Sequence, residues 1–300
     1  MARGYQIEEI KQKLVDVLND TKIGMSGVEI SKKLGVNRIT MTKYLNIFVA
    51  EGLIRQKNIG NVNIWFIEEG TEQFQFPDDY FNAKTKYIEY LTEGLENQVY
   101  SMIRNCLHSD AETRKIMSEI VIPAITSIQK LYKDGKIGNS EEKLLRQIIS
   151  NSIQILNLVP IENNPKKNMI ILSADAQSVL LAETAAATFH SDGWKVSTLG
   201  DMSSAIDVLF DLDLQKFLGK VWKQKNGIMI VIVFSDTEEG LNFFSKAVGS
   251  VKENVGKKLF LALCGKVEKK TEIKADLISE KPEDIIQWCQ TTFESSSSKN

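Results

Sequence analysis

The chain has 300 residues, of which 43% are hydrophobic and 25% charged, values that exclude a largely disordered protein and predict two or three globular domains. No apolar run approaches the roughly 18 residues that span a bilayer, and no leader-like start is apparent, so we expect a cytoplasmic protein without membrane contact. The three cysteines, Cys106, Cys264 and Cys289, are widely spaced in apolar surroundings, which excludes a disulfide framework and predicts buried free thiols.

Charge is distributed unevenly along the chain. Residues 1–66 contain ten Lys and Arg against six Asp and Glu, a net charge of +4 that leaves −6 for residues 67–300. The basic N-terminal part is therefore where we expect a polyanion to bind. The two histidines, His108 and His190, are too few and too far from the cysteines to predict a zinc site, so no metal is expected.

Residues 1–67 show the order of three helices followed by a hairpin. Gly35 separates the second and third helices, and the Gly60-Asn61 pair is typical of the tight turn between two strands. The predicted elements are helices over 7–18, 27–34 and 37–51 and strands over 53–57 and 62–67.

The segment from Ile30 to Ile54, ISKKLGVNRITMTKYLNIFVAEGLI, resembles the central part of winged helix-turn-helix domains. The resemblance implies that residues 1–67 form an α+β winged helix that binds double-stranded DNA, with the third predicted helix in the major groove and the hairpin as the wing. The alternative is an αα-hairpin in a plain helical bundle. The Gly-Asn hairpin favours the winged helix, because a bundle does not need a hairpin at that point.

The winged-helix resemblance assigns roles to polar side chains on the third helix and beside it. We expect Ile39, Leu45 and Phe48 to pack inward and Arg38, Thr42, Lys43 and Asn46 to reach base edges. The predicted DNA-binding residues on or near this helix are Asn37, Arg38, Thr40, Thr42, Lys43 and Asn46. The predicted phosphate contacts are Lys32, Lys33, Arg55 and Lys57.

The remainder of the chain divides into four predicted segments. Residues 68–79 are acidic and are predicted to be a linker, whereas 80–160 have helical periodicity and few Gly or Pro, which predicts a bundle of about four helices. We expect this bundle to support a homodimer or higher homo-oligomer. Residues 166–292 are predicted to form a flavodoxin-like α/β domain, and the serine-rich end, 293–300, a disordered tail.

Five apolar runs alternate with helix-length segments in the α/β domain, which predicts a parallel sheet with helices on both faces. The predicted strands cover 169–172, 195–198, 228–234, 259–263 and 275–278. Ligands of such sheets bind at the carboxyl ends of the strands. The loops expected there are 173–178, 200–201, 235–239 and 264–266.

The stretch from Ser173 to Gly200, SADAQSVLLAETAAATFHSDGWKVSTLG, is similar to the D-x-H-x-x-G segment of cobalamin-binding modules in corrinoid proteins and light-sensing MerR-type repressors. Upstream, LYKDGKIGNSEEKLL resembles the helical segment that covers the corrin in those repressors. A four-helix bundle followed by a flavodoxin-like domain is also the layout of these modules, so the resemblance covers about two-thirds of the chain. Cofactor-binding positions implied by the resemblance are Tyr132, Glu142, Lys143, Asp175, Gln177, Ser235 and Gly265.

Several of these positions depart from the cobalamin-binding pattern. Gln177 stands where the pattern has the cobalt-ligating histidine, Leu180 where it has glycine, and Lys143 where the upper-face histidine would be. Cys264-Gly265 replaces a pair of glycines that would admit the nucleotide tail. Because an amide and an ammonium group are poor cobalt ligands, we expect that cobalt ligation has been lost and that no cofactor is bound, with cobalamin as the alternative.

The domain order predicts a sequence-specific transcriptional regulator, nucleoid-associated in the cytoplasm, that binds an operator as a dimer. One alternative is a corrinoid-pathway binding or carrier protein whose winged helix makes protein contacts. Another is a receiver-like response regulator, since Lys281-Pro282 follows the fifth strand, but Ser235 precedes Asp236 and only Asp175 lies at the first strand. No enzyme is expected, because no Walker loop, nucleophile elbow or G-x-G-x-x-G follows a strand.

Overall fold

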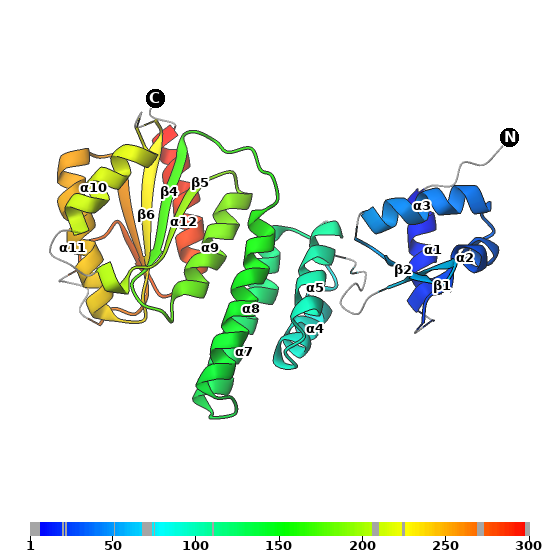
Figure 1. Ribbon diagram of the computed structural model, residues 1–300. Helices are drawn as coiled ribbons and strands as arrows, with labels where there is room; N and C mark the ends of the chain where they lie inside the picture. The colour runs from blue at the N-terminus through cyan, green and yellow to red at the C-terminus, as the bar shows by residue number, and fades with distance from the viewer. Residues whose placement is uncertain are drawn as a thin grey trace. The chain divides into compact units, whose positions relative to one another are not determined.

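The computed structural model describes residues 7–19, 21, 23–50, 52–67, 74, 76–109, 111–205, 210–223, 226–268 and 273–297. The chain divides into two compact units, Met1–Glu112 and Thr113–Asn300, and each is described by itself. Figure 1 shows the elements of both units.

The first unit begins with three helices and a three-stranded antiparallel sheet (Figure 1). The helices are α1 (Ile7–Asn19), α2 (Gly27–Leu34) and α3 (Arg38–Ala50), and the strands are β1 (Met25–Ser26), β2 (Arg55–Ile59) and β3 (Val62–Phe66). The strand order is β1-β3-β2, with Met25 opposite Trp65 and Arg55 opposite Phe66. The predicted order of helices, turn and hairpin is therefore observed, with β2 starting two residues later than expected.

Local sequence signals explain where these elements begin and end. Ser26 and Glu29 form a capping box at the start of α2: the Ser26 hydroxyl accepts from the Glu29 N–H, and the Glu29 carboxylate accepts from the Ser26 N–H at 2.8 Å. The Ser26 hydroxyl also donates to the Glu29 carboxylate at 2.7 Å, and this bond, together with the one from the Ser26 N–H, lowers the pKa of Glu29. Gly35 adopts the left-handed conformation that ends α2, and Gly60 does so in the hairpin turn.

The core of this part of the chain forms where the three helices meet Trp65. On α3, Met41, Leu45 and Phe48 are buried at the i, i+4, i+7 spacing of one helix face. Ile39 is 72% exposed, so the prediction that it packs inward is wrong. The physical reason is that Ile39 lies about 200° around the helix from Met41, which occupies the inward position instead.

The first unit also contains α4 (Tyr80–Thr92) and α5 (Glu96–His108). Residues 68–73 and 75 of the predicted linker lie outside the described residues. The end of that segment is packed rather than free, since the Phe76 ring lies 5.8 Å from Phe74 and 4.4 Å from Tyr80, between centroids. These aromatic contacts fix the entry into α4.

The second unit starts with helical elements, α6 (Thr113–Lys115), η1 (Ile116–Val121), α7 (Ile122–Lys133) and α8 (Asn139–Asn157). The first three form one continuous run in which η1 is a π-helix, and the Ile122 N–H donates to the Met117 carbonyl five residues back. Pro123 explains this irregularity, because it has no N–H to donate to the preceding turn. The helices predicted for 80–160 are therefore present, although α4 and α5 belong to the first unit.

A five-stranded parallel sheet forms the centre of the second unit. Its strands are β4 (Lys167–Ser173), β5 (Lys195–Asp201), β6 (Ile228–Phe234), β7 (Leu259–Cys264) and β8 (Leu277–Ser279). The order β5-β4-β6-β7-β8 is that of a flavodoxin-like sheet and confirms the parallel architecture predicted. The cysteines Cys106, Cys264 and Cys289 are free and buried, as expected.

Helices cover both faces of the sheet (Figure 1). The covering helices are α9 (Val179–Ser191), α10 (Phe210–Val221), α11 (Glu238–Val255) and α12 (Pro282–Ser297), and a short 3-10 turn, η2 (Ser203–Ala205), follows β5. One core layer joins the sheet to α10 and α11, and the other joins it to α9 and α12. The two apolar layers explain why β4 is apolar from Met169 to Leu172 and why β6 is apolar throughout.

The prediction that residues 293–300 form a disordered tail is wrong for its first part. Helix α12 continues to Ser297, because Phe293 packs edge-on against the buried Trp194 ring at 5.9 Å and anchors the last turns. Residues 298–300 lie outside the described part of the chain. Across the described residues, we find no helix with both the length and the apolar character needed to cross a bilayer.

Candidate functional site

The outer face of α3 is the first candidate site. Arg38, Thr42, Lys43 and Asn46 are exposed there, while Met41, Leu45 and Phe48 hold the opposite face in the core. Their i, i+4, i+8 spacing aligns Arg38, Thr42 and Asn46 on one stripe of the helix, with Lys43 beside it. A positively charged, hydrogen-bonding stripe on an exposed helix has the chemistry required to read base edges in a major groove.

Two side chains predicted as DNA contacts have local hydrogen bonds. The side-chain oxygen of Asn37 accepts from the Ile39 N–H at 2.9 Å, so Asn37 caps the start of α3. The Thr42 hydroxyl donates to the Arg38 carbonyl at 2.9 Å, which leaves it only as an acceptor. Thr40 is half-buried. The stripe is therefore best supplied with donors by Arg38, Lys43 and Asn46.

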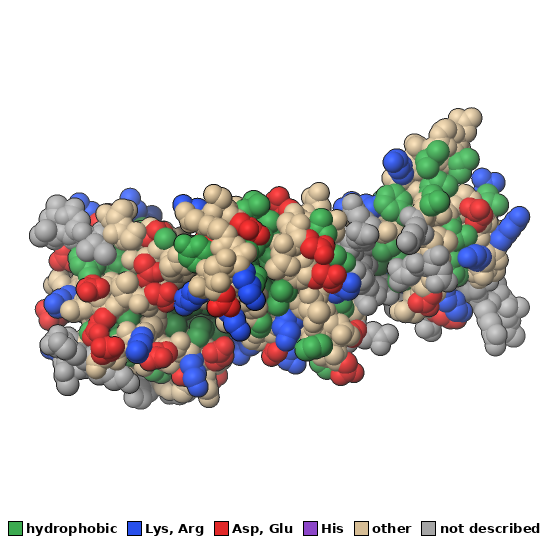
Figure 2. Space-filling view, turned by 90° about the horizontal axis from the view of Figure 1, so that it is seen from below, with side chains coloured by type: hydrophobic (Ala, Val, Ile, Leu, Met, Phe, Trp, Pro, Cys, Tyr) green, Lys and Arg blue, Asp and Glu red, His purple; other side chains and the backbone are tan. Residues whose placement is uncertain are grey.

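The predicted phosphate contacts lie on two other elements of the same part of the chain. Lys32 and Lys33 are exposed in the last turn of α2, and Arg55 and Lys57 are exposed on β2, where alternation directs both to the same face of the hairpin. Figure 2 shows several basic side chains at the surface of the N-terminal part, with acidic side chains among them. The structure thus presents cations on α2, α3 and the hairpin.

The second candidate site is the carboxyl edge of the parallel sheet, where the predicted loops meet. The Ala174 N–H donates to the Phe234 carbonyl, Ser235 N–H to Cys264, and Gly265 N–H to Ser279, at 2.8–3.0 Å. Each loop is therefore tied to the end of the neighbouring strand. Sequence reasoning placed these loops correctly at one edge.

Asp175 is the centre of this loop cluster. Its carboxylate accepts from the Ser235 hydroxyl at 2.8 Å, from the Asp236 N–H at 2.8 Å and from the Ser178 N–H at 2.9 Å. These bonds join the loop after β4 to the loop after β6 and cap the start of α9. Asp175 therefore has a structural role that requires no ligand.

Protein atoms occupy the space into which a Cβ on the glycines at this edge would extend. A Cβ on Gly265 would lie 2.1 Å from the Ser235 carbonyl oxygen, and one on Gly240 would lie 2.7 Å from the Ser235 hydroxyl. Ser235 itself is buried. The absence of side chains here thus permits close packing of Ser235, whereas the resemblance implied space for a nucleotide tail.

Arg146, on α8, was not among the residues identified from the sequence. Its guanidinium donates to the Ala176 carbonyl at 2.8 Å, to the Gln177 carbonyl at 3.1 Å and to the Gln177 side-chain oxygen at 3.3 Å. It also lies 3.6 Å from the buried Glu142 carboxylate one turn earlier. The i, i+4 pairing of Glu142 and Arg146 was readable in the sequence, but the partner loop 30 residues away was not.

The predicted upper-face residues lie on the two helices before the sheet. Tyr132, near the end of α7, is 42% exposed, and Lys143, on α8, is exposed. Glu142 is 4% exposed and pairs with Arg146. Through Arg146, the structure connects Glu142 to Gln177 in the loop after β4.

Glu183, on α9, is a further carboxylate near Arg146. Burial raises its pKa, while a hydrogen bond with Ser150 and the charge of Arg146 act in the opposite direction. One of its oxygens, Oε2, is buried without a hydrogen-bond partner in the described structure. A buried, partly unsatisfied carboxylate destabilises the fold when it is charged.

We therefore expect Glu183→Gln to raise the thermal unfolding midpoint at pH 8 and to change it much less at pH 4. A carboxyl with a raised pKa in the folded state contributes stability below its unfolded pKa and loses that contribution as the pH rises through the folded value. Thermal unfolding at the two pH values measures the difference. Glu119→Gln, at an exposed position of η1, is the control, and equal shifts for both variants at pH 8 would contradict the explanation.

Comparison with solved structures shows that this fold is shared with a corrinoid protein. The monomethylamine corrinoid protein of Methanosarcina barkeri superposes with a TM-score of 0.54 at 13% identity, covering 72% of this chain and 99% of its own. Weaker likenesses are a cobalamin-binding protein of Desulfitobacterium hafniense (TM-score 0.35, 15% identity, 70% and 98% covered) and the MtaBC methanol:cobalamin methyltransferase complex of M. barkeri (0.37, 13%, 74% and 84%). At these identities the likeness to the first protein establishes the fold alone.

Sequence comparison gives less evidence of relationship than structural comparison does. No family model matches the chain. The rat homologous-pairing protein 2 homolog is 26% identical over 106 residues, which is 35% of this chain. The match spans about half of that curated relative, 46% of its length.

The side chains at the sheet edge are not suited to act as cobalt ligands. Gln177, at the position of the pattern's histidine, offers an amide that already accepts from Arg146, and the Asp175 carboxylate is occupied by three protein donors. His190 is not part of these loops, because it lies in the last turn of α9, where its Nε2 is 3.3 Å from the Val159 carbonyl oxygen. The described residues also contain no cluster of three or more His, Cys, Asp or Glu that could hold a metal ion.

Proposed function

We propose that this chain is a DNA-binding transcriptional regulator whose residues 7–67 form a winged helix. The observation that carries the proposal is the two-sided character of α3: Met41, Leu45 and Phe48 fix one face in the core, and Arg38, Lys43 and Asn46 occupy the exposed face. An exposed helix with this charge and hydrogen-bonding pattern can enter a major groove.

The flanking elements support the same assignment. Lys32 and Lys33 at the end of α2, with Arg55 and Lys57 on the β2–β3 hairpin, would contact phosphates and position α3 without reading sequence. The hairpin would act as the wing. The net charge of +4 over residues 1–66 favours binding of a polyanion to this part of the chain.

The salt dependence of DNA binding tests the proposal. Fluorescence anisotropy of a labelled duplex with the full chain should show affinity falling by orders of magnitude between about 50 and 200 mM salt, because neutralised phosphates release counterions. A linear decrease of log affinity with log salt is the expected result. Binding that is absent at about 50 mM salt, or that does not change with salt, would overturn the proposal.

In this proposal the second unit is a sensor or assembly module, and the chain binds its operator as a homodimer. Two copies would place two α3 helices on matched half-sites of a symmetric operator. Sedimentation equilibrium of the full chain with and without operator DNA tests the stoichiometry. Two chains per duplex support the dimer, and one chain per duplex contradicts it.

A second candidate is a corrinoid-binding or carrier protein whose N-terminal part makes protein contacts. The structural comparisons favour this candidate over DNA-binding regulation, because the chain shares its fold with a corrinoid protein. The closely packed loops at Asp175, Ser235 and Gly265 oppose it in its usual form, since they leave the protein without a cobalt ligand. Any corrinoid would therefore be held through contacts other than cobalt ligation.

Gel filtration of the full chain with hydroxocobalamin and adenosylcobalamin, in light and dark, tests the second candidate. Co-elution of corrinoid absorbance with the protein supports it. A change of mass in the same experiment would connect the corrinoid to assembly and would join the two candidates in one regulator. Elution of a colourless protein with all ligands overturns the second candidate and does not affect the first.

A further inference from the structure

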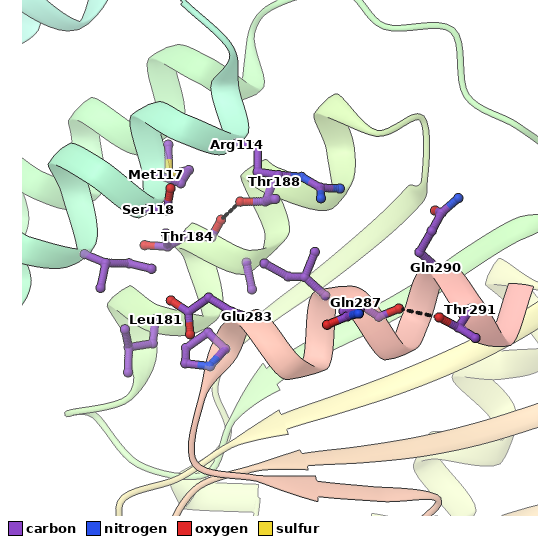
Figure 3. A pocket seen from close by; sticks show the side chains of 14 residues that line it. Arg114, Met117, Ser118, Leu181, Thr184, Thr188, Glu283, Gln287, Gln290 and Thr291 are labelled. Carbon is purple, nitrogen blue, oxygen red and sulfur yellow. Dashed lines mark hydrogen bonds between the residues drawn. The ribbon is translucent and has the colours of Figure 1, made fainter. Parts of the chain in front are cut away.

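A cavity of about 420 Å³ lies in the second unit between α9, α12 and the helical run from α6 to α7 (Figure 3). Its volume falls within the range of about 300–1,000 Å³ that is usual for small-molecule sites. Asp175, Gln177, Ser235 and Gly265 do not line it. The cavity is therefore separate from the loop cluster at the sheet edge.

The cavity exists because α9 presents small side chains there. Thr184, Ala185 and Thr188 form its floor where longer side chains would fill the space. The opposite wall contains Met117 from the π-helical turn η1. π-helical turns inside α-helices are frequent at functional sites, since they widen the helix and change the direction of its side chains.

Two threonine hydroxyls that line the cavity can act only as hydrogen-bond acceptors, whereas the side chains of Ser118, Gln287 and Gln290 can also donate. The Thr184 hydroxyl donates its hydrogen to the Leu180 carbonyl at 2.6 Å, and the Thr188 hydroxyl donates to the Thr184 carbonyl at 3.0 Å. Both hydroxyls are left with lone pairs only. A ligand group that contacts them must supply the hydrogen.

The charged side chains that line the cavity favour a ligand with a cationic group. Arg114 is paired with the Asp192 carboxylate, which neutralises its charge. Glu283, in the first turn of α12, directs its carboxylate toward Leu181 and Thr184 (Figure 3). This carboxylate attracts a cation and repels an anion.

We propose that the cavity binds a small amphiphilic amine, with an apolar body and one protonated amino group. The ammonium group contacts the Glu283 carboxylate and the Thr184 hydroxyl oxygen, and the body contacts the apolar side chains of Met117, Leu181 and Ile286. Carboxylate and hydroxyl acceptors together match an ammonium group, which has three donors and no acceptor. The assignment does not depend on either proposed function.

Three probes with one apolar body and different polar groups test the ligand class. Isothermal titration calorimetry of the full chain at pH 7 compares 4-phenylbutylamine, 4-phenylbutanol and 4-phenylbutyrate. The amine should bind about tenfold more tightly than the alcohol, and the carboxylate most weakly. Glu283→Gln should remove the advantage of the amine and leave the affinity for the alcohol unchanged.

Filling the cavity provides the matched test of location. Ser118→Leu, in the η1 wall, should abolish binding of the amine, whereas Ser127→Leu, a half-buried position on α7 outside the cavity, should preserve it. Thermal unfolding verifies that each variant is folded, and if Ser118→Leu does not fold, Glu283→Gln decides alone. Equal affinities for the three probes, no binding at about 10 mM, or amine binding that Glu283→Gln leaves unchanged would overturn the proposal.

Discussion

Arg38→Ala is expected to weaken binding of the full chain to its specific DNA by about 1–3 kcal/mol, roughly 5- to 150-fold, with relaxed discrimination at one base pair. Arg38 is exposed on the α3 stripe and carries donors in a fixed fork that matches a guanine edge. Lys43→Ala should also weaken binding, because it removes a positive charge from the same face. The expected losses are large because the acceptor atoms on the edge of the contacted base lose their hydrogen-bond donors from the protein.

A phosphate contact should behave differently from a base contact. Lys57→Ala, on the hairpin, is expected to weaken binding to specific and random duplexes alike and to reduce the salt slope by about 1. Lys216→Ala, at an exposed position of α10 in the second unit, is the matched control and should change neither quantity. Equal, small effects of Arg38→Ala and Lys216→Ala would show that α3 does not contact DNA.

In the N-terminal part, the sequence predicted every helix and the hairpin because the signals there are local. The capping box at Ser26 and the left-handed glycines Gly35 and Gly60 act within a few residues of their own position. The inward orientation of Ile39 was wrong because apolar character alone does not determine the face. Met41, two positions later, fills the core, and an exposed isoleucine on a helix is compatible with its fold.

In the second unit, alternating strands and helices predicted the parallel sheet, but its side-chain contacts depend on residues far apart in the chain. Arg146 contacts a loop 30 residues later, and Phe293 packs against Trp194 about one hundred residues earlier. Neither contact has a local signature. The serine-rich composition after Phe293 predicted a tail, but burial of that one ring extends α12.

The loop cluster at the sheet edge was predicted as a set of positions but not as a network. The resemblance implied that Asp175 is a cofactor-binding position, whereas the structure shows its carboxylate joined to Ser235, Asp236 and Ser178. Replacement of the pattern's histidine by Gln177 was visible in the sequence. The sequence does not reveal that Arg146 binds the same loop through the carbonyl oxygens of Ala176 and Gln177.

Asp175→Ala is therefore expected to lower the free energy of unfolding by about 3 kcal/mol: each hydrogen bond to a charged acceptor contributes about 1.5–3 kcal/mol, and water replaces part of the three at this half-buried position. The Ser235 hydroxyl retains the Thr237 carbonyl as an alternative partner at 3.0 Å, which limits the loss. Asp175→Asn, which keeps one carbonyl oxygen, should lie between the wild type and the alanine variant.

Urea unfolding of the full chain at pH 7 measures these differences, with Gln177→Ala as the control in the same loop. The Gln177 side chain is exposed and has one long hydrogen bond to Arg146, so its removal should change stability by less than about 0.5 kcal/mol. If Asp175 served only to orient a bound group, Asp175→Ala and Gln177→Ala would be equally stable without ligand. A large difference between them, present in the free protein, instead means that the carboxylate connects the loops after β4 and β6 as part of the fold.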